Sequence, residues 1–301
     1  MSLQYKRSQL VGCLGGVAYV LLGCSPGVTA SAQSLAEHAP AGYVLSWQDP
    51  FDTFDPGNWS RGLESDASDA TVIWNPKTGG PGLLNDGYCS YIIDDDAYVE
   101  DGKLVLRGQK RQVQGTAPEG VFEYTAGWVN SLNKRFVNGT QRGVYIEIRA
   151  KFPSGRKVWP AIWMVSETRH WPPEIDIWEY FGTYWNGNDK MYMRYIYPKS
   201  DTQRWKKENI GDASTPINGF DETYDCEAWH VYGYTWTDQH MAWSIDGVEV
   251  HRLHREPIDA YWPDEDFCLI LNNAAATKAP DLDTVWPNYL VIDYLAVWEA
   301  Q

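Results

Sequence analysis

The sequence predicts an all-β fold, a sandwich or barrel of antiparallel sheet. In residues 144–151 apolar and polar side chains alternate without a break, which predicts a strand with one buried and one solvated face. Asp246 and Gly247 separate two strand-like runs, and this dipeptide is typical of a two-residue hairpin. No stretch of a dozen residues shows the 3.6-residue period of an amphipathic helix. Many strands with turn signals between them therefore favour packed antiparallel sheets.

Further strands are expected at residues 229–237, 241–253 (divided by the hairpin turn) and 289–298. From Tyr43 onward no linker, low-complexity run or internal repeat interrupts the chain, so residues 43–301 are expected to form one domain. At ordinary strand and loop lengths such a domain has room for roughly 14 strands.

The N-terminus has the layout of an export signal. Lys6 and Arg7 precede an uncharged stretch that is too short to span a bilayer as a helix. That stretch ends in a Leu-Leu-Gly-Cys sequence similar to a bacterial lipobox, so residues 1–23 are expected to be removed and Cys24 to be lipidated. The alternative is ordinary cleavage after Ala32. Residues 24–42 are small and polar and are expected to form a flexible tether.

The composition points to a polysaccharide partner. The 301 residues carry 25 basic and 40 acidic side chains, a net charge of −15, and such a surface repels nucleic acid and anionic lipid. Trp and Tyr (16 and 19) far outnumber Phe (8), and their flat faces with polar edges suit sugar rings. Aromatic packing across strands is the alternative explanation. We expect a monomer that meets the membrane only through its lipid anchor.

Cysteines and histidines give no metal centre. Beyond the leader only Cys89, Cys226 and Cys268 remain, so at most one internal disulfide can form, and the sequence does not choose the pair. His251 and His254 have no acidic neighbour at metal-ligand spacing and are expected to be structural.

One segment, residues 171–179, combines prolines with three carboxylates. On a strand Glu174 and Asp176 point to the same face, because side chains alternate with a period of two. Glu179 would point away in a regular strand, and a single β-bulge near residues 177–178 would return it to that face. Clustered like charges raise at least one pKa, which glycosidic cleavage requires because it uses one ionised and one protonated carboxyl group. A solvated acidic face or a calcium site remains the alternative.

The segment resembles the E-x-D-x-x-E signature of glycoside hydrolase family 16 in its β-bulge form, which laminarinases, agarases and carrageenases share. Four other stretches, in the order expected for the family, extend the resemblance over residues 43–299: 158–164, 228–236, 269–272 and 292–297. The resemblance implies a β-jelly-roll sandwich with a long concave cleft and retaining hydrolysis inside polysaccharide chains.

The resemblance also implies roles for individual residues. Glu174 would be the nucleophile, Glu179 the general acid and base, and Asp176 an assisting group that hydrogen-bonds Glu174 and helps to keep Glu179 protonated. Further substrate contacts are expected from residues around these acids, with core packing as the alternative for the first two: Trp159, Trp163, Trp171, Arg194 and Asn272. Arg194 could pair with sulfate or carboxylate on an algal galactan, although a surface strand arginine is the simpler interpretation.

Departures from the family pattern bear on substrate and calcium. Pro173 stands where laminarinase-like members carry Gly, and two alanines replace a Gly-Gly after the late Asn, which weakens the case for an ordinary β-1,3-glucan. No cofactor is required, and a structural calcium is allowed through Asp293, although its usual partner segment near the start reads Asp49-Pro-Phe here.

We therefore expect an exported bacterial endo-β-glycanase, either anchored by lipid to the outer membrane or cell surface or else periplasmic or secreted. The expected substrate is a β-1,3- or β-1,3/1,4-glucan. The alternatives are a marine galactan (agar, porphyran or carrageenan), a transglycosylase with the same covalent intermediate, and a carbohydrate-binding jelly roll without catalysis. A polysaccharide lyase is disfavoured because no Tyr or His base beside a charge-neutralising group stands out.

Overall fold

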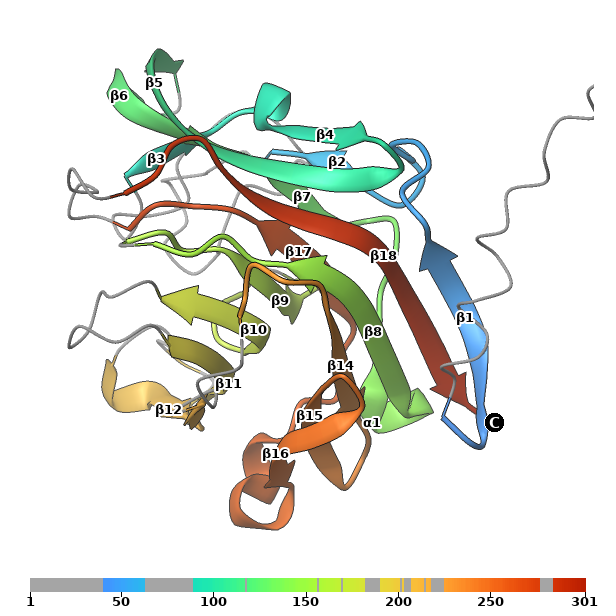
Figure 1. Cartoon of the computed structure of the whole chain (residues 1–301). Helices are drawn as coiled ribbons and strands as arrows, with labels where there is room; N and C mark the ends of the chain where they lie inside the picture. The colour runs from blue at the N-terminus through green and yellow to red at the C-terminus, as the bar shows by residue number, and fades with distance from the viewer. Residues whose placement is uncertain are drawn as a thin grey trace, which may run out of the picture.

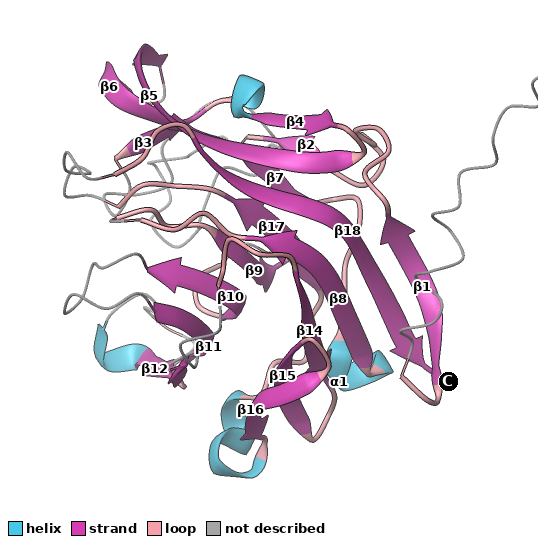
Figure 2. Ribbon diagram, in the orientation of Figure 1, coloured by secondary structure: helices cyan, strands magenta, loops and turns pink. Residues whose placement is uncertain are grey.

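The described part of the chain forms two curled β-sheets packed face to face (Figures 1 and 2). This computed structural model describes residues 40–62, 89–116, 118–155, 157–168, 170–181, 190–200, 202, 207–213, 215–217, 225–276 and 284–301. Nearly all strand pairs are antiparallel, as expected, and the one parallel pair joins β3 (Ser90–Ile92) to β6 (Glu119–Ala126). The expected sandwich is confirmed.

The larger sheet has ten strands and the smaller has eight. The larger runs β16 (Val248–His254), β15 (His240–Ile245), β14 (His230–Trp236), β8 (Val144–Lys151), β18 (Asn288–Ala300), β5 (Lys103–Thr116), β6 and β3, with β1 (Tyr43–Asp49) beside β18 and β4 (Ala97–Glu100) beside β5. The smaller runs β12 (Ile210–Asp212), β11 (Lys190–Pro198), β10 (Glu174–Phe181), β9 (Ala161–Ser166), β17 (Phe267–Asn272), β7 (Trp128–Asn130) and β2 (Ser60–Arg61), with β13 (Thr215–Ile217) beside β11. These eighteen strands exceed the expected fourteen because several have only two or three residues.

Helical structure is confined, in the described residues, to short turns (Figure 2). These are α1 (Gly139–Arg142), η2 (Asp94–Asp96), η3 (Lys207–Asn209) and η4 (Glu256–Tyr261). None of the described helices is long and apolar enough to cross a membrane. The expected leader, Cys24 and most of the expected tether lie outside the described residues.

The expected strands fall where the sequence patterns place them. β8 buries its apolar positions completely between the sheets, but its opposite face is only partly solvated: Glu147 is 2% exposed and accepts hydrogen bonds from the Tyr145 and Tyr294 hydroxyls. The hairpin between β15 and β16 turns at Asp246 and Gly247, whose φ angles of 49° and 77° fit a two-residue turn of the primed type.

Gly127 marks the crossing of the chain from one sheet to the other, between β6 and β7. A Cβ atom at this position would lie 2.0 Å from the carbonyl oxygen of Asp96 and 3.1 Å from Cα of Leu106. Backbone cannot move away as a flexible side chain can, so the crossing requires glycine. It carries the chain onto β7, which pairs with β17 and β2 in the smaller sheet.

The core between the sheets takes up much of the aromatic content. Fully buried rings in this core include Trp59, Trp178, Trp236 and Trp243. For these residues the cross-strand packing explanation holds, rather than contact with sugar. The three cysteines beyond the leader are thiols, and burial raises the pKa of Cys89 to about 11.

Candidate active site

A β-bulge in β10 places three carboxylates on one face. Asp176 pairs with Trp163 on β9, and Trp178 pairs with the adjacent Ile162. Two residues of β10 therefore advance against one of β9, which is the bulge. Ile177 and Trp178 are both fully buried in the core between the sheets, whereas Glu179 returns to the opposite face. The expected bulge is confirmed, and it groups the acids on the face of the smaller sheet that points away from the core.

Indole N–H groups hold the two outer carboxylates. The Trp171 Nε1 donates to Glu174 Oε2 over 2.9 Å, and the Trp159 Nε1 donates to Glu179 Oε1 over 2.6 Å. Both tryptophans are half-buried beside the acids. Trp159 is expected to contact substrate, and in the structure the N–H edge of its ring faces Glu179. Neither indole hydrogen bond was foreseen.

Arg194 on β11 faces the acids rather than open solvent. It pairs in register with Asp176, and its Nε lies 3.8 Å from Asp176 Oδ2. Its Nη1 lies 3.4 Å from Glu179 Oε2, and its Nη2 lies 3.1 Å from Asp212 Oδ2 on β12. The interpretation as an ordinary surface arginine is therefore wrong. Asp212 is a member of the cluster that no sequence motif pointed to.

Burial raises the pKa values of all three acids, and repulsion within the cluster raises those of Glu174 and Asp176 further. Desolvation and the charge of Glu179 raise the pKa of Glu174 to about 7, against the opposing effects of Arg194 and the Trp171 hydrogen bond. The pKa of Asp176 rises well above its ordinary value because of burial and the charges of Glu179 and Glu174. Burial also raises the pKa of Glu179, which Arg194 and Trp159 oppose. The cluster therefore retains protons at a pH at which isolated carboxylates are fully ionised.

Asp176 differs from its expected role in one respect. Its Oδ2 is buried and has no hydrogen-bond partner among the described residues, so the expected hydrogen bond to Glu174 is not made through that oxygen. A buried carboxylate oxygen without a donor is strongly destabilised when charged. Asp176 is therefore the member of the cluster for which the neutral, protonated form is strongly favoured.

The remaining expected substrate contacts lie beside the acids, but deeper. Trp163 is 4% exposed and packs edge-on against Trp128, with ring centroids 5.6 Å apart. Its Nε1 donates to Oδ1 of the fully buried Asn272 over 2.7 Å. The core-packing alternative describes Trp163 in this structure, and its contact with substrate stays a prediction. Contact of Asn272 with substrate stays a prediction.

Asp293 does not fit a calcium site. Its carboxylate lies 2.6 Å from Arg149 Nη1 and 3.8 Å from Lys103 Nζ, so two cations already neutralise it. Asp49, in the other half of the expected site, accepts from Asn58 and Trp59. No group of three potential metal ligands occurs in the described ranges. Asp293 therefore has a structural explanation without a metal.

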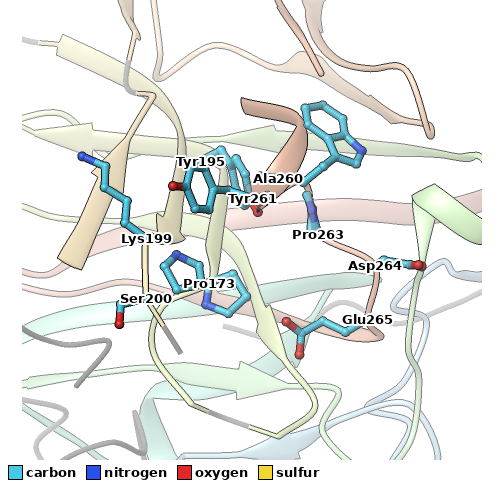
Figure 3. A pocket seen from close by; sticks show the side chains of 11 residues that line it. Pro173, Tyr195, Lys199, Ser200, Ala260, Tyr261, Pro263, Asp264 and Glu265 are labelled. Atoms are coloured by element: carbon cyan, nitrogen blue, oxygen red, sulfur yellow. Dashed lines mark hydrogen bonds between the residues drawn. The ribbon is translucent and has the colours of Figure 1, made fainter. Parts of the chain in front are cut away.

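A pocket of about 310 Å³ opens beside the start of β10 (Figure 3). Pro173, which precedes Glu174, forms part of its wall together with Tyr195 and Tyr261. The Tyr195 hydroxyl donates to the backbone oxygen of Tyr261 over 2.5 Å. This hydrogen bond links β11, the neighbour of β10, to the end of η4.

Comparison with known proteins agrees with this geometry. A sequence profile of Glycosyl hydrolases family 16 matches residues 92–280. A protein named beta-glucanase from Rhodothermus marinus is 27% identical over 93% of this chain and 91% of its own length. A keratan-sulfate endo-1,4-beta-galactosidase from Sphingobacterium multivorum is 28% identical over 87% of this chain and 56% of its own. The crystal structure of a laminarinase catalytic domain from Thermotoga maritima MSB8 superposes with a TM-score of 0.67 at 26% identity, over 86% of this chain and 99% of that one.

The pKa of Glu174 predicts a pH-dependent stability. Its folded value of about 7 lies above the ordinary 4.5, so the folded state binds the proton more tightly than the unfolded state. The resulting stabilisation is complete below pH 4.5 and is lost as the pH rises through about 7. Glu174→Gln cannot ionise at this position. We therefore expect its free energy of unfolding at about pH 8 to be larger than that of the wild type by on the order of 2 kcal/mol.

Urea unfolding at about pH 8 and at about pH 5 measures this difference. The gain in unfolding free energy should largely vanish at the lower pH. Glu100→Gln, a substitution at an exposed position outside the site, should change the unfolding free energy little at either pH. An equal gain for Glu174→Gln at both pH values would contradict the raised pKa.

Proposed function

This chain belongs to glycoside hydrolase family 16, and on that premise we propose that it is a retaining endo-β-glucanase acting on a β-1,3- or β-1,3/1,4-glucan. It is a glycoside hydrolase that acts on O-glycosyl bonds. The observation that carries the proposal is the bulge in β10, which turns Glu174 and Glu179 to the same face. Two carboxyl groups on one face can serve as the nucleophile and the general acid and base of a double displacement.

In the first step Glu179 gives its proton to the glycosidic oxygen while the Glu174 carboxylate attacks the anomeric carbon. The bond from that carbon to the leaving oxygen breaks, and an ester bond to Glu174 forms. In the second step Glu179 takes a proton from water, the water oxygen bonds to the anomeric carbon, and Glu174 leaves as a carboxylate. Trp171 restrains the orientation of the Glu174 carboxyl group, because its indole N–H donates to Oε2.

The electrostatics of the site favour a neutral polysaccharide. The guanidinium of Arg194 already faces Asp176, Glu179 and Asp212, so a substrate sulfate would have to compete with three carboxylates of the protein. It would also be repelled by these acids. Relatives and structural neighbours named beta-glucanase and laminarinase support a glucan. The relative named for keratan sulfate keeps a galactan as the second candidate.

Two other candidates share the fold. Three clustered carboxylates that repel one another are unfavourable, and a binding module without catalysis does not require them. This disfavours a binding module. A transglycosylase uses the same covalent intermediate and differs only in its acceptor, and a product analysis with and without added oligosaccharide acceptor separates the two.

We expect the wild type to release reducing ends from laminarin or lichenan and to shorten the polymer rapidly, because cleavage is internal. Agarose, porphyran and carrageenans, tested in parallel, should yield little product. Glu174→Gln and Glu179→Gln should each lower kcat by at least about 10²-fold, since each removes a group that moves a proton or forms the ester. Glu100→Gln should retain activity.

A reducing-end assay combined with size-exclusion chromatography measures both effects, and circular dichroism checks that the variants fold. Activity confined to a sulfated galactan would overturn the substrate assignment. Near-wild-type turnover by either glutamine variant would overturn the assignment of the site.

We also propose that the protein is exported and anchored through a lipidated Cys24, with residues 1–23 removed. Full-length protein expressed in a bacterium should then partition with detergent in phase separation, and Cys24→Ser should remain unprocessed or be released. A wild-type protein that is wholly soluble and begins at Gln33 would show that cleavage follows Ala32 instead.

A further inference from the structure

We propose that Arg194 is a positioning residue that acts through Glu179 and sets the pH range in which the enzyme works. The inference rests on the roles proposed above for Glu174 and Glu179. It assigns to Arg194 an internal task, stabilising charge as it passes between the two glutamates, in place of contact with substrate.

The geometry of Arg194 suits this task. Its residue pairs directly with Asp176 across β10 and β11, which fixes the base of the side chain beside the acids. Its three guanidinium nitrogens face Asp176, Glu179 and Asp212 at 3.8, 3.4 and 3.1 Å. The side chain is only 25% exposed, so solvent screens these charges less than at an open surface.

The reaction moves one negative charge from Glu174 to Glu179. Before cleavage Glu174 is ionised and Glu179 holds a proton, whereas in the covalent intermediate Glu174 is a neutral ester and Glu179 is ionised. Arg194 Nη1 and Trp159 Nε1 donate to the two oxygens of Glu179. Both hydrogen bonds are strongest when Glu179 is ionised, so they stabilise the state that follows proton donation.

Charged and titratable residues of three strands lie around Glu179 in the described part of the chain. On β10 they are Glu174 and Asp176, on β11 Arg194 and Tyr192, and on β12 Asp212. The neighbours on β9 and β17, Ala161 and Asn272, carry no titratable group. Arg194 is thus the one cation among several acids in this part of the structure, and it lowers the pKa values of both Glu174 and Glu179.

Asp212 holds the outer end of the guanidinium and adds a negative charge of its own. Its side chain is 45% exposed, so its effect on the catalytic pair is weaker than that of Arg194. It raises the pKa values of Glu174 and Glu179, opposite in sign to Arg194. The two residues therefore allow a test in which substitutions move the pH profile in opposite directions.

The experiment is the pH dependence of kcat/KM on laminarin for full-length wild type, Arg194→Gln, Arg194→Lys and Asp212→Asn. In Arg194→Gln both limbs of the profile should move to higher pH by on the order of one unit, because an adjacent positive charge is lost. Arg194→Lys, which keeps the charge, should move them by less than half as much. Asp212→Asn should move both limbs to lower pH.

A purely structural role would lower kcat or the melting temperature and leave both limbs in place. Unchanged limbs in Arg194→Gln, or an equal shift in Arg194→Lys, would overturn the proposal. Should Arg194→Gln fail to fold, the direction of the shift in Asp212→Asn decides, and an unmoved profile there also overturns it. Activity of the wild type on laminarin, and its loss in Glu174→Gln, test the proposed function separately.

Discussion

A single extra residue in β10 is the constraint on which the site depends. The bulge turns Glu179 to the face of Glu174 and Asp176, and it does so because Ile177 and Trp178 are both buried in the core between the sheets. Removing the bulge would flip the following side chains, exposing the Trp178 indole and burying Glu179 among apolar residues. The hydrophobic core thus enforces the arrangement that the chemistry needs.

Grouping three acids in this way destabilises the fold, and the surrounding side chains limit that cost. Trp171 and Trp159 donate N–H bonds to the outer two acids, and Arg194 supplies the positive charge. None of these groups removes the strain on Asp176, whose buried Oδ2 lacks a donor. Burial therefore favours a proton on Asp176, and it also raises the pKa of Glu179, the proposed proton donor to the glycosidic oxygen.

Local sequence patterns predicted much of the fold and the three acids at the centre of the site. The alternation in residues 144–151 located β8, the Asp246-Gly247 pair located the hairpin, and the spacing of Glu174, Asp176 and Glu179 predicted the bulge. These features depend on neighbours in sequence. Partners from distant strands left no such pattern.

The missed features are therefore the long-range contacts. Asp212 meets Arg194 only because β12 pairs with β11, and Asp293 meets Arg149 only because β18 pairs with β8. Trp163 is of a residue type that suits contact with sugar rings, but it packs edge-on against Trp128 from another strand. In each case the sequence supplied the right residue type, and the tertiary neighbour determined what it does.

Glu174 is the proposed nucleophile, and trapping its covalent intermediate tests that assignment most directly. A 2-deoxy-2-fluoro laminaribiosyl fluoride slows hydrolysis of the ester more than its formation, so the labelled enzyme accumulates. Tandem mass spectrometry of the peptide that spans β10 then locates the added sugar. We expect the sugar on Glu174, and a label on Asp176 or Glu179 would show that Glu174 is not the nucleophile.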